Sequence, residues 1–192
     1  KIGYNFYGSE FEEEVPFLMA NLIFGGGDFS SRLMDNLRSQ RGYVYGIYSG
    51  VTYNQQGGLY YINTDVAPTK ACETLKAVKA EMLAIKEGKE KISAEELFRN
   101  INLYNAFFPK SYDTQIDVLA KIMFDLEIMG KEEDSINNLI KAYNDLTPEQ
   151  VQEVFTKHTF PERFLTVIVG RKDEILPAFE EQGLEVEVVE LF

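Results

Sequence analysis

The stretch GGGDFSSRLMDNLRSQRGYVYG, residues 25–46, predicts how this chain passes from helices into a sheet. One helical pattern runs from about residue 12 to residue 24, and a second runs from about residue 30 to residue 40. Glycine accepts the left-handed backbone that ends helices, so we expect Gly25 to cap the first helix and Gly42 to stop the second. The stretch therefore predicts two helices packed at an angle, followed directly by a strand.

A β-hairpin is expected next. Residues 43–53 (YVYGIYSGVTY) and residues 58–66 (GLYYINTDV) are rich in aromatic and β-branched residues, and the short polar loop NQQG separates them. Such a loop between two runs of this kind is a strong hairpin signal. Residues 1–7 (KIGYNFY) also have a strand pattern, with Ile2, Tyr4 and Phe6 on one face.

The remainder of the chain is mainly helical. Helical patterns cover residues 68–88, 93–130 (with a break or kink at Pro109), 133–143, 147–158 and 173–182. Residues 163–170 are expected to form a buried strand and residues 184–191 a closing strand. This order of elements predicts an α+β fold with one mostly antiparallel sheet and helices packed on one face. No linker or internal repeat is visible, so residues 1–192 are expected to form a single domain.

The composition excludes several classes of protein. The net charge is −12, from 31 acidic and 19 basic residues, which argues against nucleic acid as a partner because phosphate binding requires clustered Lys and Arg. The chain has no apolar run of transmembrane length and no visible signal peptide. It begins with Lys1 rather than Met, so we interpret it as a processed or excised piece. We expect a soluble protein of the cytoplasm or periplasm, and the compartment stays open.

Three kinds of chemical site have little support in the sequence. The glycines at 25–27 lack the Lys of a phosphate-binding loop, and a left-handed turn between two helices explains them better. With one His and one Cys far apart, the chain has no zinc motif such as H-x-x-E-H, so no metal ligand is expected. His158 ends a predicted helix, where interaction with the helix dipole explains it. A Ser, Thr or Cys nucleophile would lack a neighbouring base.

Arg38 and Tyr45 remain as candidate site residues. Arg38 lies in the last turn of the second predicted helix, and Tyr45 lies near the start of the next strand. An Arg beside a Tyr hydroxyl can bind a carbonyl oxygen and the negative charge that develops on it. Two structural alternatives stay open: Arg38 could pair with Asp35 one turn back, and Tyr45 could belong to the sheet core with a hydrated hydroxyl.

The stretch GGGDFSSRLMDNLRSQRGYVYGIYSG resembles the signature of the C-terminal homologous domain of the pitrilysin-like zinc peptidases, which include insulin-degrading enzyme and the mitochondrial processing peptidase. Leu37-Arg38, Gly42 and Tyr45 match the family's pattern in type and spacing. The resemblance extends over nearly the whole chain, including the ending VIVGRKDEILPAFEEQGLEVEVVEL. It implies the metallohydrolase fold of the mitochondrial processing peptidase.

The resemblance also implies a function. In such enzymes a zinc-bearing domain and a domain of this type close around an unfolded peptide, and the zinc domain carries H-x-x-E-H. This chain would then supply Arg38 and Tyr45 as catalytic residues that orient the peptide and stabilise the oxyanion. Zinc would be bound by the partner domain or subunit, and the chain alone should be inactive. The alternative is a non-catalytic peptide-binding or scaffold subunit of the same fold.

Overall fold

The fold is built on one antiparallel sheet, seen in a computed structural model that describes residues 1–54, 56–128, 130 and 134–189. The sheet contains β1 (Ile2–Phe6), β2 (Val44–Asn54), β3 (Gly57–Val66) and β4 (Leu165–Thr166). These four strands lie in the order β2-β3-β1-β4. The expected hairpin is confirmed, since β2 and β3 pair in antiparallel register from Asn54↔Gly57 onward.

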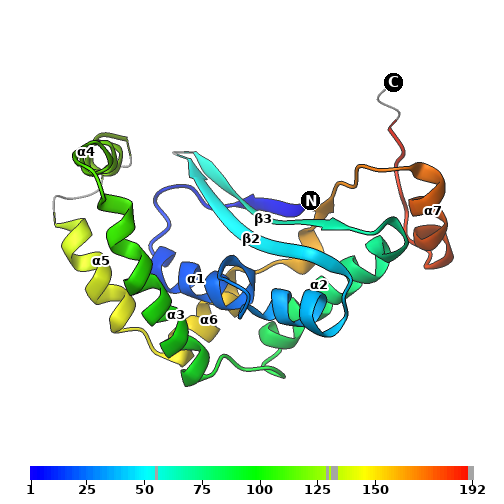
Figure 1. The fold of residues 1–192 in the computed structure, drawn as a ribbon, viewed down its shortest axis with the longest axis horizontal. Coiled ribbons are helices and arrows are strands. Elements are labelled where there is room, and N and C mark those ends of the chain that lie inside the picture. The colour runs from blue at the N-terminus through cyan, green and yellow to red at the C-terminus, as the bar shows by residue number, and fades with distance from the viewer. Residues whose placement is uncertain (55, 129, 131–133, 190–192) are drawn as a thin grey trace.

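Helices cover one face of this sheet, as Figure 1 shows for α1, α2 and α6. The α-helices are α1 (Glu14–Asn21), α2 (Ala71–Lys86), α3 (Ala94–Phe107), α4 (Gln115–Met123), α5 (Ser135–Asn144), α6 (Pro148–His158) and α7 (Lys172–Glu181). Shorter π-helical segments span Leu22–Gly26, Met34–Gln40 and Phe124–Ile128, and 3₁₀ turns span Pro68–Lys70, Phe108–Tyr112 and Pro161–Arg163. The predicted α+β class is confirmed.

The two faces of the sheet differ in the way strand periodicity predicts. Tyr4 of β1 lies opposite Tyr60 of β3, and both side chains are buried with their rings stacked 5.2 Å apart between centroids. The next residues along, Asn5 and Leu59, are also directly paired, and both are exposed on the other face. The core therefore lies between the sheet and the helices.

Helix starts and breaks follow the local sequence. Capping boxes begin two helices: Ser93 caps α3 and Thr147 caps α6. The Thr147 hydroxyl accepts a hydrogen bond from the backbone N–H of Gln150. Pro109 ends α3, as expected, and the chain continues as a 3₁₀ turn. The expected helix at residues 133–143 is α5, although Glu133 itself lies outside the described residues.

The expectation for the two last strands was wrong in part. Only Leu165 and Thr166 of the segment 163–170 form a strand, and the segment is not buried, since Leu165 is 72% and Val169 is 85% exposed. β4 pairs only with Ile2 and Gly3 at the edge of the sheet. Residues 184–189 have no regular structure, and residues 190–191 lie outside the described part of the chain. An alternating apolar pattern indicates a face, but a strand also requires a partner in register.

The glycines at 25–27 do not act as predicted. In the described part of the chain, positive φ occurs only at Gly42, Gly88, Gly130 and Gly183. Gly25 lies inside a π-helical segment, and a Cβ atom there would lie 2.7 Å from the Leu33 side chain. These glycines therefore permit close packing instead of a left-handed turn. Gly42 does stop its helix as expected, with φ of +64°.

Arg32 joins the glycine-rich stretch to the start of α3. Its guanidinium binds Glu96 through two bonds, Nε–Oε1 at 2.7 Å and Nη2–Oε2 at 2.9 Å, and also donates to the carbonyl oxygens of Glu90 and Lys91. Burial alone would raise the pKa of Glu96, but hydrogen bonds from Arg32 and from the Ser93 amide lower that pKa to about 2. The pair therefore stabilises the ionised carboxylate within the folded protein.

We expect Glu96→Gln to lower the free energy of unfolding at pH 7 by about 2 kcal/mol. Gln preserves the capping box but loses the charge-assisted bonds to Arg32. Because the pKa of Glu96 falls from 4.5 to about 2 on folding, this contribution is present above pH 4.5 and disappears as the pH falls towards 2. Denaturant titrations followed by circular dichroism at several pH values measure it. The exposed neighbour substitution Glu95→Gln is the control, and equal curves for both variants would contradict the assignment.

Candidate functional site

Arg38 comes from the π-helical segment Met34–Gln40, which lies against the edge strand β2. Hydrogen bonds in a π-helix join residues five apart, so side chains five apart become neighbours. Asp35 accordingly accepts a bond from Gln40 (Nε2–Oδ2, 2.7 Å), and Asn36 accepts one from Arg41 (Nε–Oδ1, 2.6 Å). The alternative in which Arg38 pairs with Asp35 was therefore wrong, because it assumed the spacing of an α-helix.

Tyr45 lies on a β-bulge at the start of β2. Val44 pairs with Val66 and Gly46 pairs with Asp65, so Tyr45 is the extra residue between two consecutive pairs. A bulge turns a side chain away from the direction that strand alternation would give it. The Tyr45 side chain is 85% exposed, so the alternative that placed it in the sheet core was wrong.

The structure brings these two predicted residues together. Arg38 Cζ lies 5.1 Å from the centroid of the Tyr45 ring, within the range of a cation–π contact. Gly42 makes this approach achievable, because its left-handed backbone reverses the chain between the two residues. Their proximity is thus a structural finding, while their part in catalysis stays a prediction.

Phe29 is a third member of this cluster, and the sequence reasoning did not identify it. Its ring centroid lies 4.4 Å from Arg38 Cζ, and its side chain is 64% exposed. The Asp28 carboxylate accepts bonds from both the Ser30 amide and the Ser30 hydroxyl, which fixes the turn that carries Phe29. The available signal was a large aromatic residue placed inside a polar, glycine-rich connection.

The hydrogen-bond donors of Arg38 are available to a ligand. The nearest acidic residues in sequence are engaged elsewhere: Asp28 binds Ser30, and Asp35 binds Gln40. The bonds from the Ser30 side chain and amide also lower the pKa of Asp28. Within the described ranges, no carboxylate lies at ion-pair distance from Arg38. An arginine with free donors beside a tyrosine hydroxyl is suited to hold a carbonyl oxygen or an anion.

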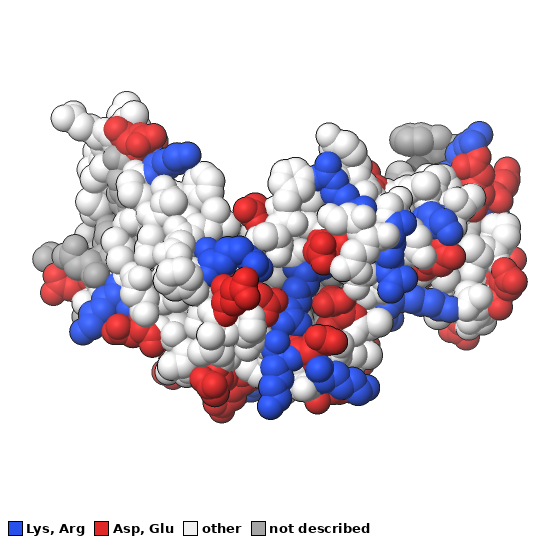
Figure 2. Space-filling model, turned by 60° about the horizontal axis from the view of Figure 1, so that its bottom comes forward, with Lys and Arg blue, Asp and Glu red and all other residues white. Residues whose placement is uncertain are grey.

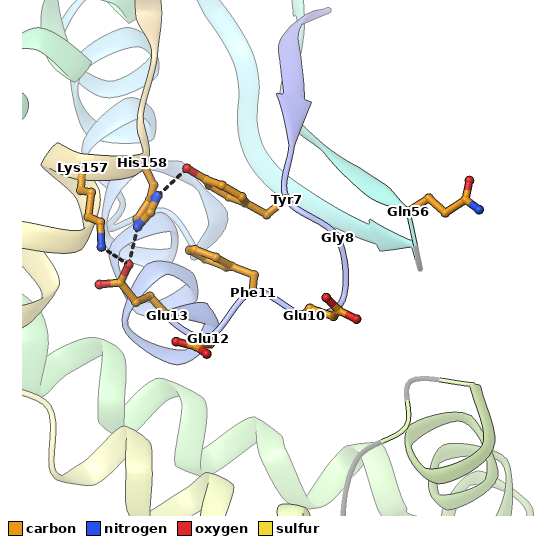
Figure 3. Close-up of a pocket in the computed structure, with 9 residues that line it drawn as sticks. All are labelled: Tyr7, Gly8, Glu10, Phe11, Glu12, Glu13, Gln56, Lys157 and His158. Atoms are coloured by element: carbon orange, nitrogen blue, oxygen red, sulfur yellow. Dashed lines mark hydrogen bonds and ion pairs between the residues drawn. The ribbon is translucent and has the colours of Figure 1, made fainter.

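A second polar cluster surrounds His158, the last residue of α6 (Figure 3). The His158 ring is buried, with Nε2 2.6 Å from Glu13 Oε2 and Nδ1 3.0 Å from the Tyr7 hydroxyl. Hydrogen bonds from Lys157 and His158 lower the pKa of Glu13. The expected position at the helix end is confirmed, but the ring binds side chains from the start of α1 and the end of β1. This cluster lines a hollow of ≈ 630 Å³.

The described residues do not form a metal site. Nowhere in that part of the chain do three His, Cys, Asp or Glu side chains come together as ligands. The His158 cluster supplies only one His and one carboxylate near each other, which is fewer than the three protein ligands of a catalytic zinc. Zinc therefore does not fit these residues.

The charged surface is mixed. In the view of Figure 2, Lys and Arg side chains alternate with Asp and Glu side chains over the described residues instead of gathering in one large basic area. Such interspersed charges are typical of a solvated face. No helix among the described residues is long and apolar enough to cross a membrane.

Residues 1–104, more than half of the 192-residue chain, match the family described as the peptidase M16 inactive domain. The chain belongs to this family. The match includes Phe29, Arg38 and Tyr45, and it confirms the resemblance to the non-zinc domain of the pitrilysin-like zinc peptidases. Comparison with curated proteins gives no match.

Solved structures share the fold of this M16 inactive domain. A peptidase M16 inactive domain from Pseudomonas fluorescens is 23% identical with a TM-score of 0.76; the match covers 85% of this chain and 38% of that one. The inactive peptidase domain of a protein described as a zinc protease, from Bordetella parapertussis, is 13% identical with a TM-score of 0.69, covering 85% and 87%. A chain of complex III2 from Candida albicans is 12% identical with a TM-score of 0.69, covering 85% and 40%. The M16 inactive domain thus spans well under half the length of the Pseudomonas and Candida chains.

Proposed function

We propose that this M16 inactive domain is the substrate-clamping, transition-state-stabilising half of a zinc-dependent endopeptidase that degrades or processes unfolded peptides. Residues 1–192 would form one domain, paired with a homologous zinc-bearing domain or subunit. The proposal rests mainly on what surrounds the Arg38 guanidinium. Its guanidinium contacts Tyr45 at an exposed corner of the sheet and has no carboxylate partner among the described residues.

The chemistry of these two side chains suits peptide hydrolysis. The zinc of the partner domain supplies the activated water when it is bound there. Arg38 donates N–H bonds in the plane of its guanidinium, which suits a peptide carbonyl oxygen and the oxyanion it becomes. The Tyr45 hydroxyl, on the ring beside Arg38, would donate one further bond. Both donors act on the substrate oxygen, and neither requires a metal on this chain.

A scaffold function is the second candidate. It is supported by the similarity in fold to a chain of complex III2, although that likeness is limited to the fold. The guanidinium donors of Arg38 bind no protein acceptor in the described structure, so a substrate oxygen can use them, whereas a scaffold does not require such donors. We therefore favour the endopeptidase half.

We expect this chain alone to show no chelator-sensitive hydrolysis of an internally quenched fluorescent peptide. Activity should appear when the chain is joined to, or mixed with, its zinc-bearing partner, and a chelator should abolish that activity. The measurement compares the chain, the partner and the assembled enzyme at equal concentration. Zinc-dependent turnover by the chain alone would contradict the proposal, and an assembled complex that holds zinc but never cleaves peptides would favour the scaffold.

A further inference from the structure

We propose that Phe29 is a positioning residue for Arg38: its ring holds the guanidinium in the orientation in which it meets the substrate. This inference rests on the function proposed above for Arg38 and Tyr45. Phe29 would not touch the reacting atoms. It would act on turnover only through the arginine.

Contact geometry is the first support. Phe29 lies closer to the guanidinium than Tyr45 does, at 4.4 Å against 5.1 Å between Arg38 Cζ and the ring centroids. Both rings therefore lie within the 6 Å range of a cation–π contact with the same cation. Among the described residues no hydrogen bond or ion pair of the Arg38 guanidinium is found, so the two ring contacts are the directional interactions that orient it.

The rigidity of the Phe29 turn is the second support. Two hydrogen bonds join the residues on either side of Phe29. The Asp28 carboxylate accepts from the Ser30 backbone amide at 2.8 Å, and the Ser31 backbone amide donates to the Asp28 carbonyl oxygen at 3.1 Å. Arg99 of α3 also donates to the Ser30 carbonyl oxygen at 3.4 Å. The turn that carries Phe29 is thus held in place by hydrogen bonds. The Phe29 side chain is 64% exposed and does not enter the core.

Pre-orientation matters for an arginine in particular. The side chain has many rotamers, and ordering it only as the oxyanion forms would raise the free energy of the transition state at each turnover. A cation–π contact at an exposed site contributes about 0.5–1 kcal/mol, which corresponds to a factor of about two to five in the population of the oriented state. The ring is therefore expected to change kcat by a factor of this size.

The test uses the assembled enzyme and an internally quenched fluorescent peptide. Phe29→Leu keeps an apolar side chain but removes the ring, and it should lower kcat about two- to fivefold with KM changed by less than about twofold. Phe29→Tyr keeps the ring and should restore kcat. Phe98→Leu is the matched control, since Phe98 is 67% exposed on α3 and should leave kcat unchanged. Circular dichroism melts establish that each variant is folded.

A double-mutant cycle separates this inference from the proposed function. In an Arg38→Ala background, Phe29→Leu should have no further effect on kcat, because the ring acts through the guanidinium. If Arg38→Ala lowers kcat but Phe29→Leu does not, or if the two losses multiply, Phe29 is not a positioning residue and the function of Arg38 stands. If Arg38→Ala itself leaves kcat unchanged, the proposed function fails, and this inference fails with it.

Discussion

Arg38→Ala should lower peptide turnover by the assembled enzyme about 100-fold to 1,000-fold, the loss expected when one oxyanion donor is removed. The fold should remain intact, because the guanidinium makes no hydrogen bond or ion pair in the described structure and the two rings beside it, Phe29 and Tyr45, are exposed. The measurement pairs kcat with a thermal melt of the same preparation. Arg38→Lys should recover only part of the activity, since an ammonium group lacks the planar fork of donors.

The matched control for Arg38 is Arg41, three residues further along. Arg41 is exposed, bonded to Asn36, and near the Tyr43 ring at 5.8 Å. Arg41→Ala removes the same charge from the same corner and should leave kcat near that of the unmodified enzyme. Equal losses for Arg38→Ala and Arg41→Ala would mean that overall charge, and not the donors of Arg38, affects turnover.

Gly26→Ala should lower the free energy of unfolding by about 3 kcal/mol. A Cβ atom at Gly26 would lie 2.3 Å from the Asn21 side-chain nitrogen, which is too close for any real contact. Asn21 cannot move away freely, because it is buried and makes two bonds to Ser49: its Oδ1 accepts from the Ser49 hydroxyl at 2.6 Å, and its Nδ2 donates to the Ser49 carbonyl oxygen at 3.3 Å. The added methyl group therefore has to break this buried pair or shift α1 away from β2.

Gly88→Ala is the comparison variant for Gly26→Ala, because it introduces backbone strain without crowding a neighbouring atom. Nothing lies within 4 Å of a Cβ atom at Gly88, but its φ is +70°, so alanine there costs about 1 kcal/mol through backbone strain alone. Denaturant titrations of both variants, followed by circular dichroism, should show Gly26→Ala as clearly the less stable. A Gly26→Ala protein no less stable than Gly88→Ala would show that the Asn21–Ser49 pair relaxes readily.

Much of the fold could be predicted because its signals are local. The hairpin, the caps at Ser93 and Thr147, the break at Pro109 and the stop at Gly42 each depend on residues a few positions apart, and each was confirmed. Signals that needed a distant partner were less reliable. The segments 163–170 and 184–191 alternate as strands do, yet only residues 165–166 pair with the sheet in the described structure.

The candidate site likewise combines features that local sequence determines with features that depend on distant residues. The amino-acid sequence alone determined that Arg38 and Tyr45 flank one helix–strand corner, because Gly42 must interrupt the helix between them. Only the tertiary structure decided which contacts they make. The π-helical backbone pairs Asp35 with Gln40, so Arg38 does not have Asp35 as a partner. The bulge in β2 turns Tyr45 outward. The hydrogen-bonded turn at Asp28 places the Phe29 ring beside the Arg38 guanidinium. All three features lie where segments far apart in the sequence meet: the π-helical segment lies against β2, the bulge lies in the pairing of β2 with β3, and Arg99 of α3 binds the turn beside Phe29. Such contacts depend on tertiary packing, which local sequence patterns do not reveal.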